Sequence, residues 1–264
     1  MDKATIITGV TDYFKDDPRL SALFLAGSFG RGEEDEFSDI DFVAIASSEH
    51  HDALMGKWRA ALETLTTLIM WKRPYPSTPL INVVTEDWIR CDLYLISPDK
   101  LTGRAQTTVK PLIDPTDIYH RLPASLPDAT PNKDRVVAII SEFIRVIGMT
   151  PIVMGRGELV TAVQGAGLLR DMLISLMLEE VTKPDKGGAM HLSRLLPSSD
   201  YAALMALPAP APDRQSVLIS QQAIAAVFLP RARRLATELD IDWPETFLAK
   251  TRDHLRAEVG LELG

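Results

Sequence analysis

Two short apolar segments, separated by a glycine-rich turn and a charged stretch, constrain the fold of this chain most strongly. The first, residues 22–27, runs into Gly27-Ser28-Phe29-Gly30-Arg31-Gly32, and the second, residues 39–46, opens with Asp39-Ile40-Asp41. Apolar runs of this length, bounded by turn residues, indicate strands. Side chains alternate between the two faces of a strand, so Asp39 and Asp41 should share one face, about 7 Å apart.

This arrangement predicts a metal-bound nucleotide. Two carboxylates held side by side repel each other, which raises at least one pKa unless a cation lies between them. Mg²⁺ takes one or two protein carboxylates and completes its coordination with water and phosphate oxygens. The turn offers backbone N–H groups, the Ser28 hydroxyl and the Arg31 guanidinium, which are suitable partners for a polyphosphate. We therefore expect one or two Mg²⁺ ions and a nucleoside triphosphate here.

The same residues carry a family resemblance. Gly27-Ser28 followed by Asp39-x-Asp41 resembles the signature of the polymerase-β-like nucleotidyltransferase superfamily. The form Gly-Ser-x-x-Arg-Gly followed by Ser38-Asp39-Ile40-Asp41 is most similar to the antibiotic nucleotidyltransferases, which modify aminoglycosides and lincosamides. The resemblance implies an α+β fold, in which a small mixed sheet flanked by helices forms an N-terminal catalytic domain and an all-α helical bundle follows.

A third carboxylate lies in the strand predicted at residues 89–96. Its apolar face consists of Ile89, Cys91, Leu93 and Leu95, which makes Cys91 a core residue. Asp92 lies on the other face, where a charged residue in mid-strand needs a compensating partner. The resemblance implies that Asp92 is the third catalytic carboxylate, on a strand next to that of Asp41; the alternative is an ordinary solvent-facing aspartate.

The chain changes character near residues 122–131, which contain three prolines. We expect a catalytic domain at residues 1–122, with further strands at 68–71 and 80–84 and a proline-rich surface loop from Pro74 to Pro79 between them. Residues 132–264 show only helical patterns and are expected to form the acceptor-binding domain. Helices are predicted at 133–147, 157–180, 199–206, 213–239 and after Pro244. The helix at 157–180 is apolar on most of its circumference, which is typical of the centre of a bundle.

Two acidic residues of the predicted bundle are candidates for binding the acceptor. Glu158 begins an otherwise apolar helix and Asp171 lies in its middle, so both need partners. For Asp171 an ion pair with a neighbouring arginine is favoured. For Glu158 an ion pair and a substrate contact remain equally open, and it is the one candidate substrate residue retained.

Charge and composition argue against several classes of function. The 264 residues carry a formal net charge of −8 and no strong cluster of Lys and Arg, which disfavours nucleic acid as a partner. Uninterrupted apolar runs long enough for a membrane span are missing, and the N-terminus does not resemble a secretory signal. The single cysteine excludes an intrachain disulfide and fits a cytoplasmic location. An oligomeric state is not indicated.

Together these features predict an enzyme that moves a nucleoside monophosphate, with AMP from ATP expected, onto a hydroxyl of a small molecule and releases pyrophosphate. Asp39 and Asp41 would bind the metal, and Gly27, Ser28 and Arg31 the phosphates. Asp92 would either complete a second metal site or act as general base. The alternative acceptors are a protein, as in toxin–antitoxin nucleotidyltransferases, or a nucleic acid. A catalytically silent nucleotide-binding module is the remaining alternative.

Overall fold

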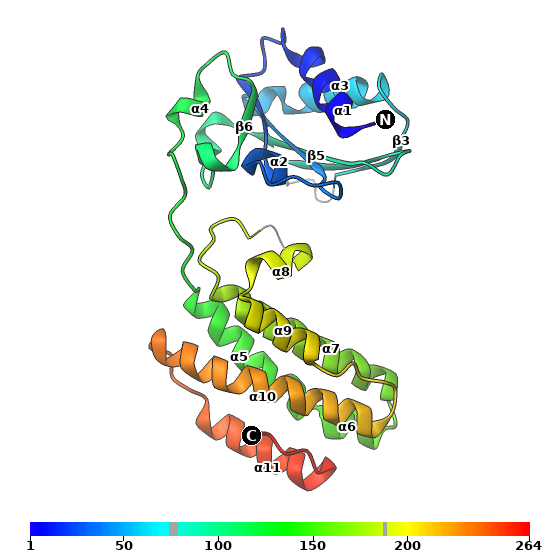
Figure 1. Ribbon diagram of the computed structural model, residues 1–264, viewed down its shortest axis with the longest axis vertical. Helices are drawn as coiled ribbons and strands as arrows, with labels where there is room; N and C mark the ends of the chain where they lie inside the picture. The colour runs from blue at the N-terminus through cyan, green and yellow to red at the C-terminus, as the bar shows by residue number, and fades with distance from the viewer. Residues whose placement is uncertain (74–78, 187–188) are drawn as a thin grey trace. The chain divides into compact units, whose positions relative to one another are not determined.

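The computed structural model describes residues 1–73, 79–186 and 189–264 of the chain. These residues form two compact units, Met1–Pro127 and Asp128–Gly264 (Figure 1). The loop predicted between Pro74 and Pro79 lies outside the described residues, except for Pro79 itself.

The first unit is built on a six-stranded sheet in the order β3-β4-β5-β2-β1-β6. Neighbouring strands run antiparallel, except that β2 and β5 run parallel, so the predicted mixed sheet is confirmed. The strands β1 and β2 are the two apolar segments that flank the glycine-rich stretch. The bounds are β1 Ala22–Leu25, β2 Ile40–Ile45, β3 Leu68–Lys72, β4 Leu80–Thr85, β5 Arg90–Ile96 and β6 Lys110–Ile113.

The two faces of this sheet are covered unequally. Helices α1 (Lys3–Phe14) and α3 (His51–Glu63) lie against one face, where Phe14, Trp58 and the apolar side chains of β5 form the larger core cluster. The other face carries a smaller cluster that includes Val43, Ile45 and Ile118 of α4 (Ile118–Arg121). Burial along β5 alternates strictly, with Cys91, Leu93 and Leu95 buried, as the sequence predicted. Asp92 therefore faces the less covered side.

One prediction for the local structure of this unit was wrong. The segment predicted as a tight turn forms a short helix, α2 (Gly27–Arg31). Gly27 at φ 56° and Gly32 at φ 67° adopt left-handed backbone at its two ends, a conformation that glycine enters at little cost.

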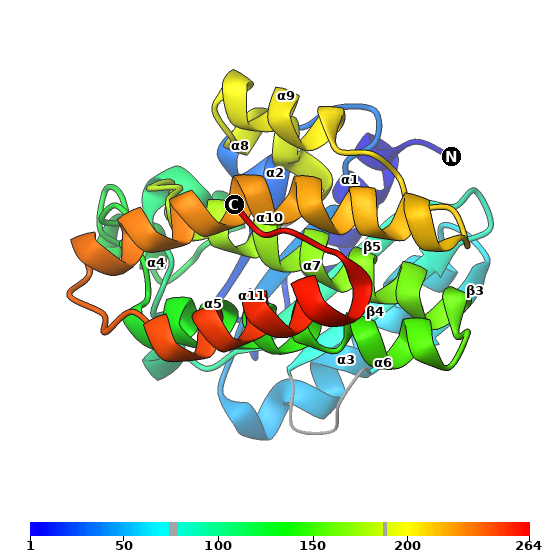
Figure 2. The ribbon, with the colours of Figure 1, turned by 90° about the horizontal axis from the view of Figure 1, so that it is seen from below.

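The second unit contains helices and no strand among its described residues. Its helices are α5 Lys133–Gly148, α6 Thr150–Gly155, α7 Leu159–Glu179, α8 Leu192–Leu195, α9 Ser198–Ala206, α10 Arg214–Glu238 and α11 Glu245–Val259 (Figures 1 and 2). The rings of Phe143 on α5 and Phe228 on α10 stack 3.7 Å apart at the centre of this core. The five predicted helices are confirmed, whereas the short helices α6 and α8 were not predicted.

The apolar composition of helix α7 predicted a helix surrounded on all sides. In the structure, one side of α7 is exposed. Leu169 and Leu173 are buried against the core shared with α5 and α10, but Val160 is 69% exposed and Leu168 52%. Two stretches, Lys133–Gly155 and Leu159–Glu179, have the length and apolar composition of a membrane span. Part of each stretch is buried in the core of the helical unit, 33% of the first apolar window and 28% of the second.

Candidate functional site

Three carboxylates, Asp39, Asp41 and Asp92, lie near the beginning of β2 and β5 and are called the carboxylate site below. Asp41 and Asp92 are register partners across the parallel pair of strands, and neighbouring strands lie about 4.8 Å apart. Phe42 on β2 is fully buried in the larger core cluster, so Asp41 points to the opposite face, as Asp92 does. Asp39 immediately precedes β2, and its side chain is 30% exposed.

The carboxylates disturb one another's ionisation. Burial, followed by the charges of Asp39 and Asp92, raises the pKa of Asp41 to about 6. Burial also raises the pKa of Asp92, and a hydrogen bond from Asn82 opposes this rise. Protein groups alone therefore do not compensate the charge on Asp41, and a cationic ligand would remove the conflict.

Two further residues contact the carboxylate site, and neither was singled out from the sequence. The Arg90 guanidinium lies 3.3 Å from Oδ2 of Asp39, and Nδ2 of Asn82 donates a 2.7 Å hydrogen bond to Oδ2 of Asp92. Arg90 lies two residues before Asp92 on β5, so strand alternation puts both side chains on the same face. Asn82 is the register partner of Asp92 across β4 and β5, so finding it required the pairing of those strands.

The first residues of α2 lie directly against Asp41. The Ala26 N–H donates to the Asp41 main-chain oxygen at 2.8 Å, and a Cβ on Gly27 would lie 2.0 Å from Asp41 Oδ2. Only glycine fits there. The Ser28 hydroxyl is buried without a hydrogen-bond partner in the described residues. A buried hydroxyl with unmet hydrogen-bonding capacity is suited to an incoming polar ligand.

Arg31, the last residue of α2, is partly committed within the protein. Its Nε donates a 2.8 Å hydrogen bond to Glu33, and the Arg31 side chain is only 12% exposed. Its positive charge still acts on Asp41, where it lowers the carboxyl pKa. Arg31 is thus close enough to influence the site electrostatically, with part of its donor capacity already used.

The donor set fits a metal that arrives with phosphate rather than one enclosed by protein. Within residues 1–73, 79–186 and 189–264, no group of three or more His, Cys, Asp or Glu side chains is arranged to hold a metal ion by itself. Mg²⁺ does not need such a group, because it is usually held by one or two carboxylates together with water and substrate phosphates. Asp41, its carboxylate neighbours and the unpartnered Ser28 hydroxyl match that requirement.

The candidate residues of the helical unit are placed differently. Glu158 precedes α7, is exposed and makes no capping hydrogen bond. The ion pair predicted for Asp171 is not present in the described part of the chain, so that prediction was wrong. The neighbouring Arg170 instead donates to the main-chain oxygens of Leu207 and Pro208. Both acids are therefore exposed to solvent.

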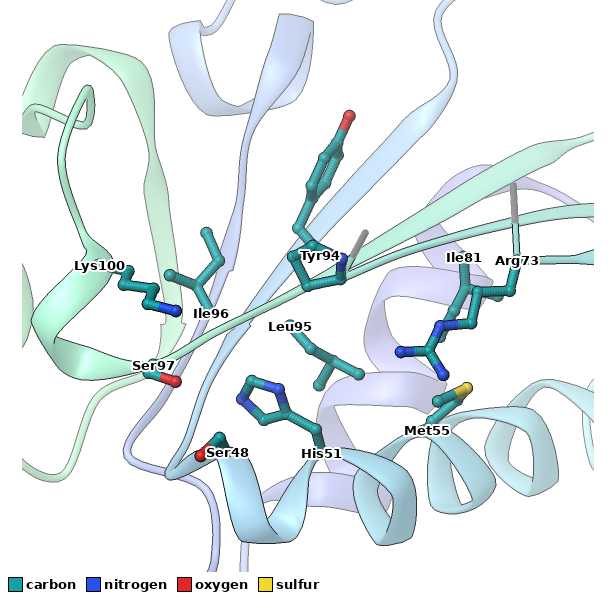
Figure 3. A pocket seen from close by; sticks show the side chains of 11 residues that line it. Ser48, His51, Met55, Arg73, Ile81, Tyr94, Leu95, Ile96, Ser97 and Lys100 are labelled. Atoms are coloured by element: carbon teal, nitrogen blue, oxygen red, sulfur yellow. The ribbon is translucent and has the colours of Figure 1, made fainter. Parts of the chain in front are cut away.

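A separate pocket of about 370 Å³ lies near the other end of β5 (Figure 3). Its lining includes His51, Arg73 and Lys100, and none of the three carboxylates. Figure 3 shows the Tyr94 ring extending away from His51, toward the face of the sheet that bears Asp92. The pocket and the carboxylate site therefore occupy different parts of the first unit.

Comparison with known families gives a match over nearly the whole chain. The model of a family described as streptomycin adenylyltransferase matches residues 2–257. A search of curated protein sequences finds no significant relative.

Several solved structures resemble this chain distantly. An aminoglycoside 6-adenyltransferase from Bacillus subtilis is 15% identical, with a TM-score of 0.45, over 96% of this chain and 98% of that one. A spectinomycin adenyltransferase from Enterococcus faecialis with ATP and spectinomycin is 14% identical, with a TM-score of 0.33, over 88% and 100%. A CCA-adding enzyme from Thermotoga maritima complexed with tRNA is 11% identical, with a TM-score of 0.33, over 97% and 70%.

Proposed function

Since this chain belongs to the streptomycin adenylyltransferase family, we propose that it transfers AMP from ATP to a hydroxyl group of an aminoglycoside and releases pyrophosphate. The family match confirms the resemblance to antibiotic nucleotidyltransferases that the Gly-Ser and Asp-x-Asp motifs indicated. The observation that carries the proposal is the pairing of Asp41 with Asp92 beside Gly27, which leaves a poorly compensated carboxylate where a metal-bound triphosphate would fit.

In this proposal Asp39 and Asp41 hold Mg²⁺. The positive charge of the ion would compensate the negative charge of the Asp41 carboxylate, which protein groups leave poorly compensated. When bound, Mg²⁺ would supply positive charge against the developing charge on the phosphate oxygens. The Ser28 hydroxyl and the main-chain N–H groups around Gly27 bind the β- and γ-phosphates. Arg31 adds positive charge, although its hydrogen bond to Glu33 reduces the number of donors it can offer.

Asp92 is proposed either to accept the proton of the acceptor hydroxyl or to complete a second metal site. Its hydrogen bond from Asn82 orients the carboxylate and favours the ionised form, which both roles need. A general base must be unprotonated and within hydrogen-bond reach of the hydroxyl it serves. The two roles predict different pH profiles, which are developed in the Discussion.

The proposal also covers the donor nucleotide, the class of acceptor and the cellular location. ATP is the proposed donor, because the matching family is described as an adenylyltransferase. The net charge of −8 disfavours a nucleic acid acceptor, because binding phosphate backbones depends on Lys and Arg. A cytoplasmic location agrees with the single cysteine, Cys91, which is buried and reduced.

The acceptor is proposed to bind through the helical domain, residues 132–264, with the catalytic domain at residues 1–122. Aminoglycosides are polycations, so exposed carboxylates without ion-pair partners are suitable contacts. Within the residues that the structure describes, Glu158 is exposed and has no ion-pair partner. Glu158→Gln should raise the KM for the aminoglycoside and leave the KM for ATP unchanged, while the exposed Glu258→Gln on α11 serves as the matched control. Equal KM values in both variants would exclude Glu158.

The reaction itself is tested with the purified chain, MgATP and a panel of acceptors. Streptomycin, spectinomycin, a lincosamide, RNA and a carrier protein are each incubated, and both pyrophosphate release and the mass of the acceptor are measured. Addition of AMP to an aminoglycoside, abolished in Asp41→Asn, is the expected result. Labelling of protein or RNA instead would replace the proposed acceptor class, and ATP binding without any transfer would favour the silent module.

A further inference from the structure

Arg104, between β5 and β6, reaches the face of the sheet that bears the carboxylate site. Its guanidinium lies over the Tyr94 ring, 5.8 Å from the ring centroid. Tyr94 is two residues beyond Asp92 on β5 and is the register partner of Val43, two residues beyond Asp41 on β2. The same charge acts on the acid itself, because Arg104 lowers the pKa of Asp41.

The donor groups of Arg104 are not used within the described residues. Arg104 is half-buried, yet it makes no ion pair and no hydrogen bond there. The other two arginines near these carboxylates are engaged, Arg90 with Asp39 and Arg31 with Glu33. A guanidinium has five N–H donors in a planar fork, and leaving them unpaired in a partly buried position is unfavourable. This contrast marks Arg104 as the cation available for a ligand.

The geometry also indicates what kind of ligand would pair with it. The guanidinium lies over the Tyr94 ring, and its N–H groups make no hydrogen bond within the described residues. Available guanidinium donors match the paired oxygens of a carboxylate or a phosphate. The carboxylates of the site lie beyond ion-pair distance from Arg104 and are assigned to the metal in the proposed function. A phosphate group of the donor nucleotide is the remaining match.

We propose that Arg104, held against the Tyr94 ring, binds phosphate oxygens of the donor triphosphate. This inference rests on the proposed function and adds a nucleotide-binding residue to it. In the competing account, Arg104 only supports the Tyr94 ring and the segment before β6. The two accounts differ in which ligand loses affinity when the charge is removed.

The test replaces Arg104 with methionine, which keeps an unbranched apolar stem and removes the guanidinium and its charge. A charge-assisted contact of this kind corresponds to about a 10- to 100-fold change in affinity. We expect the Kd of MgATP, measured by titration calorimetry without acceptor, to rise by that factor, and the KM of the aminoglycoside to stay unchanged. Arg104→Lys should recover part of the affinity. The control is Arg59→Met, since Arg59 also lies over an aromatic ring, Trp71 at 5.2 Å, but belongs to α3 on the opposite face of the sheet.

The possible outcomes separate this inference from the proposed function. A wild-type chain that adenylates an aminoglycoside, together with an Arg104→Met variant of unchanged ATP affinity, would overturn the inference alone. If Arg104→Met weakens ATP binding and raises the acceptor KM to the same extent, the purely supporting role is favoured. That result would also overturn the inference. If the wild type does not bind ATP, both the inference on Arg104 and the proposed function are wrong. Far-UV circular dichroism checks folding, and Arg104→Gln replaces the methionine variant if that one does not fold.

Discussion

Gly27 and Asp41 lie so close together that a Cβ atom on Gly27 would be 2.0 Å from Oδ2 of Asp41. The main chain links the same segments, because the Ala26 N–H donates to the Asp41 oxygen at 2.8 Å. The start of α2 and the start of β2 are therefore held together through backbone and side chain. The absence of a side chain at Gly27 fixes where the Asp41 carboxylate can lie.

Gly27→Ala is expected to inactivate the enzyme. The new methyl group would displace the Asp41 carboxylate, and the φ of 56° is unfavourable for alanine. Because a misplacement of about 1 Å can cost roughly 10²-fold in rate, transfer should fall at least that far. The control is Gly56→Ala in α3, where a Cβ meets no atom within 4 Å and alanine is the better helix former. A Gly27→Ala variant with normal turnover would contradict the tight placement of Asp41.

Asp41→Asn should abolish transfer and at the same time stabilise the metal-free protein at high pH. A folded-state pKa of about 6, raised from 3.8, means that the folded state favours the protonated acid. The associated stability is fully present below about pH 4 and is lost as pH rises through 6, which amounts to about 3 kcal/mol. Asparagine imitates the protonated form at every pH. Urea unfolding at pH 5 and pH 8 should show the variant gaining most at pH 8; a variant less stable than wild type at pH 8 would refute the assignment.

The activity of the wild type should decline on the acid side of about pH 6. Protonated Asp41 cannot bind a metal, and kcat/KM reports the ionisation of the free enzyme. The measurement is a profile of kcat/KM for MgATP between pH 5 and pH 9. Aminoglycoside amino groups titrate too, so the profile is repeated with a second acceptor. An acid limb that shifts with the acceptor would place the titrating group on the substrate instead.

Asp92→Asn should lower the rate at least about 10²-fold, the usual loss when a general base is removed. Asn82→Ala is a milder variant of the same site. It keeps Asp92 but removes the 2.7 Å hydrogen bond that favours the ionised carboxylate. If Asp92 is the base, losing this hydrogen bond raises its pKa further, so the Asn82→Ala defect should be largest at the acid end of the profile and shrink as pH rises. A defect of Asn82→Ala that is the same at every pH would point to a positioning role for Asn82 and leave Asp92 as a metal ligand.

The regular elements of the chain were largely predictable because their signals are local. The alternation along residues 89–96 placed Asp92 and Cys91 on opposite faces, and the structure agrees. The helical period of α5 was equally clear. Short helices could not be predicted in this way, because α6 and α8 span too few residues for a helical period to be seen. The five-residue helix α2 was taken for a turn for the same reason.

The surroundings of the carboxylates could not be predicted, because they depend on contacts between distant segments. Asn82 meets Asp92 only because β4 pairs with β5 in one register, and a shift by one residue would move Asn82 to the other face. Arg104 follows a strand end and shows no pattern of its own in the sequence. The exposed side of α7 was missed because apolar composition does not reveal which neighbours are present.

Each of the two units closes its own hydrophobic core, one around Trp58 and the other around the stacked rings of Phe143 and Phe228. Mutations in separate cores have nearly independent effects on stability. Under the proposed function, substitutions selected by a new drug can therefore accumulate in the helical unit without destabilising the unit that binds ATP. Natural variants with altered drug spectra should consequently carry their substitutions mainly after residue 127.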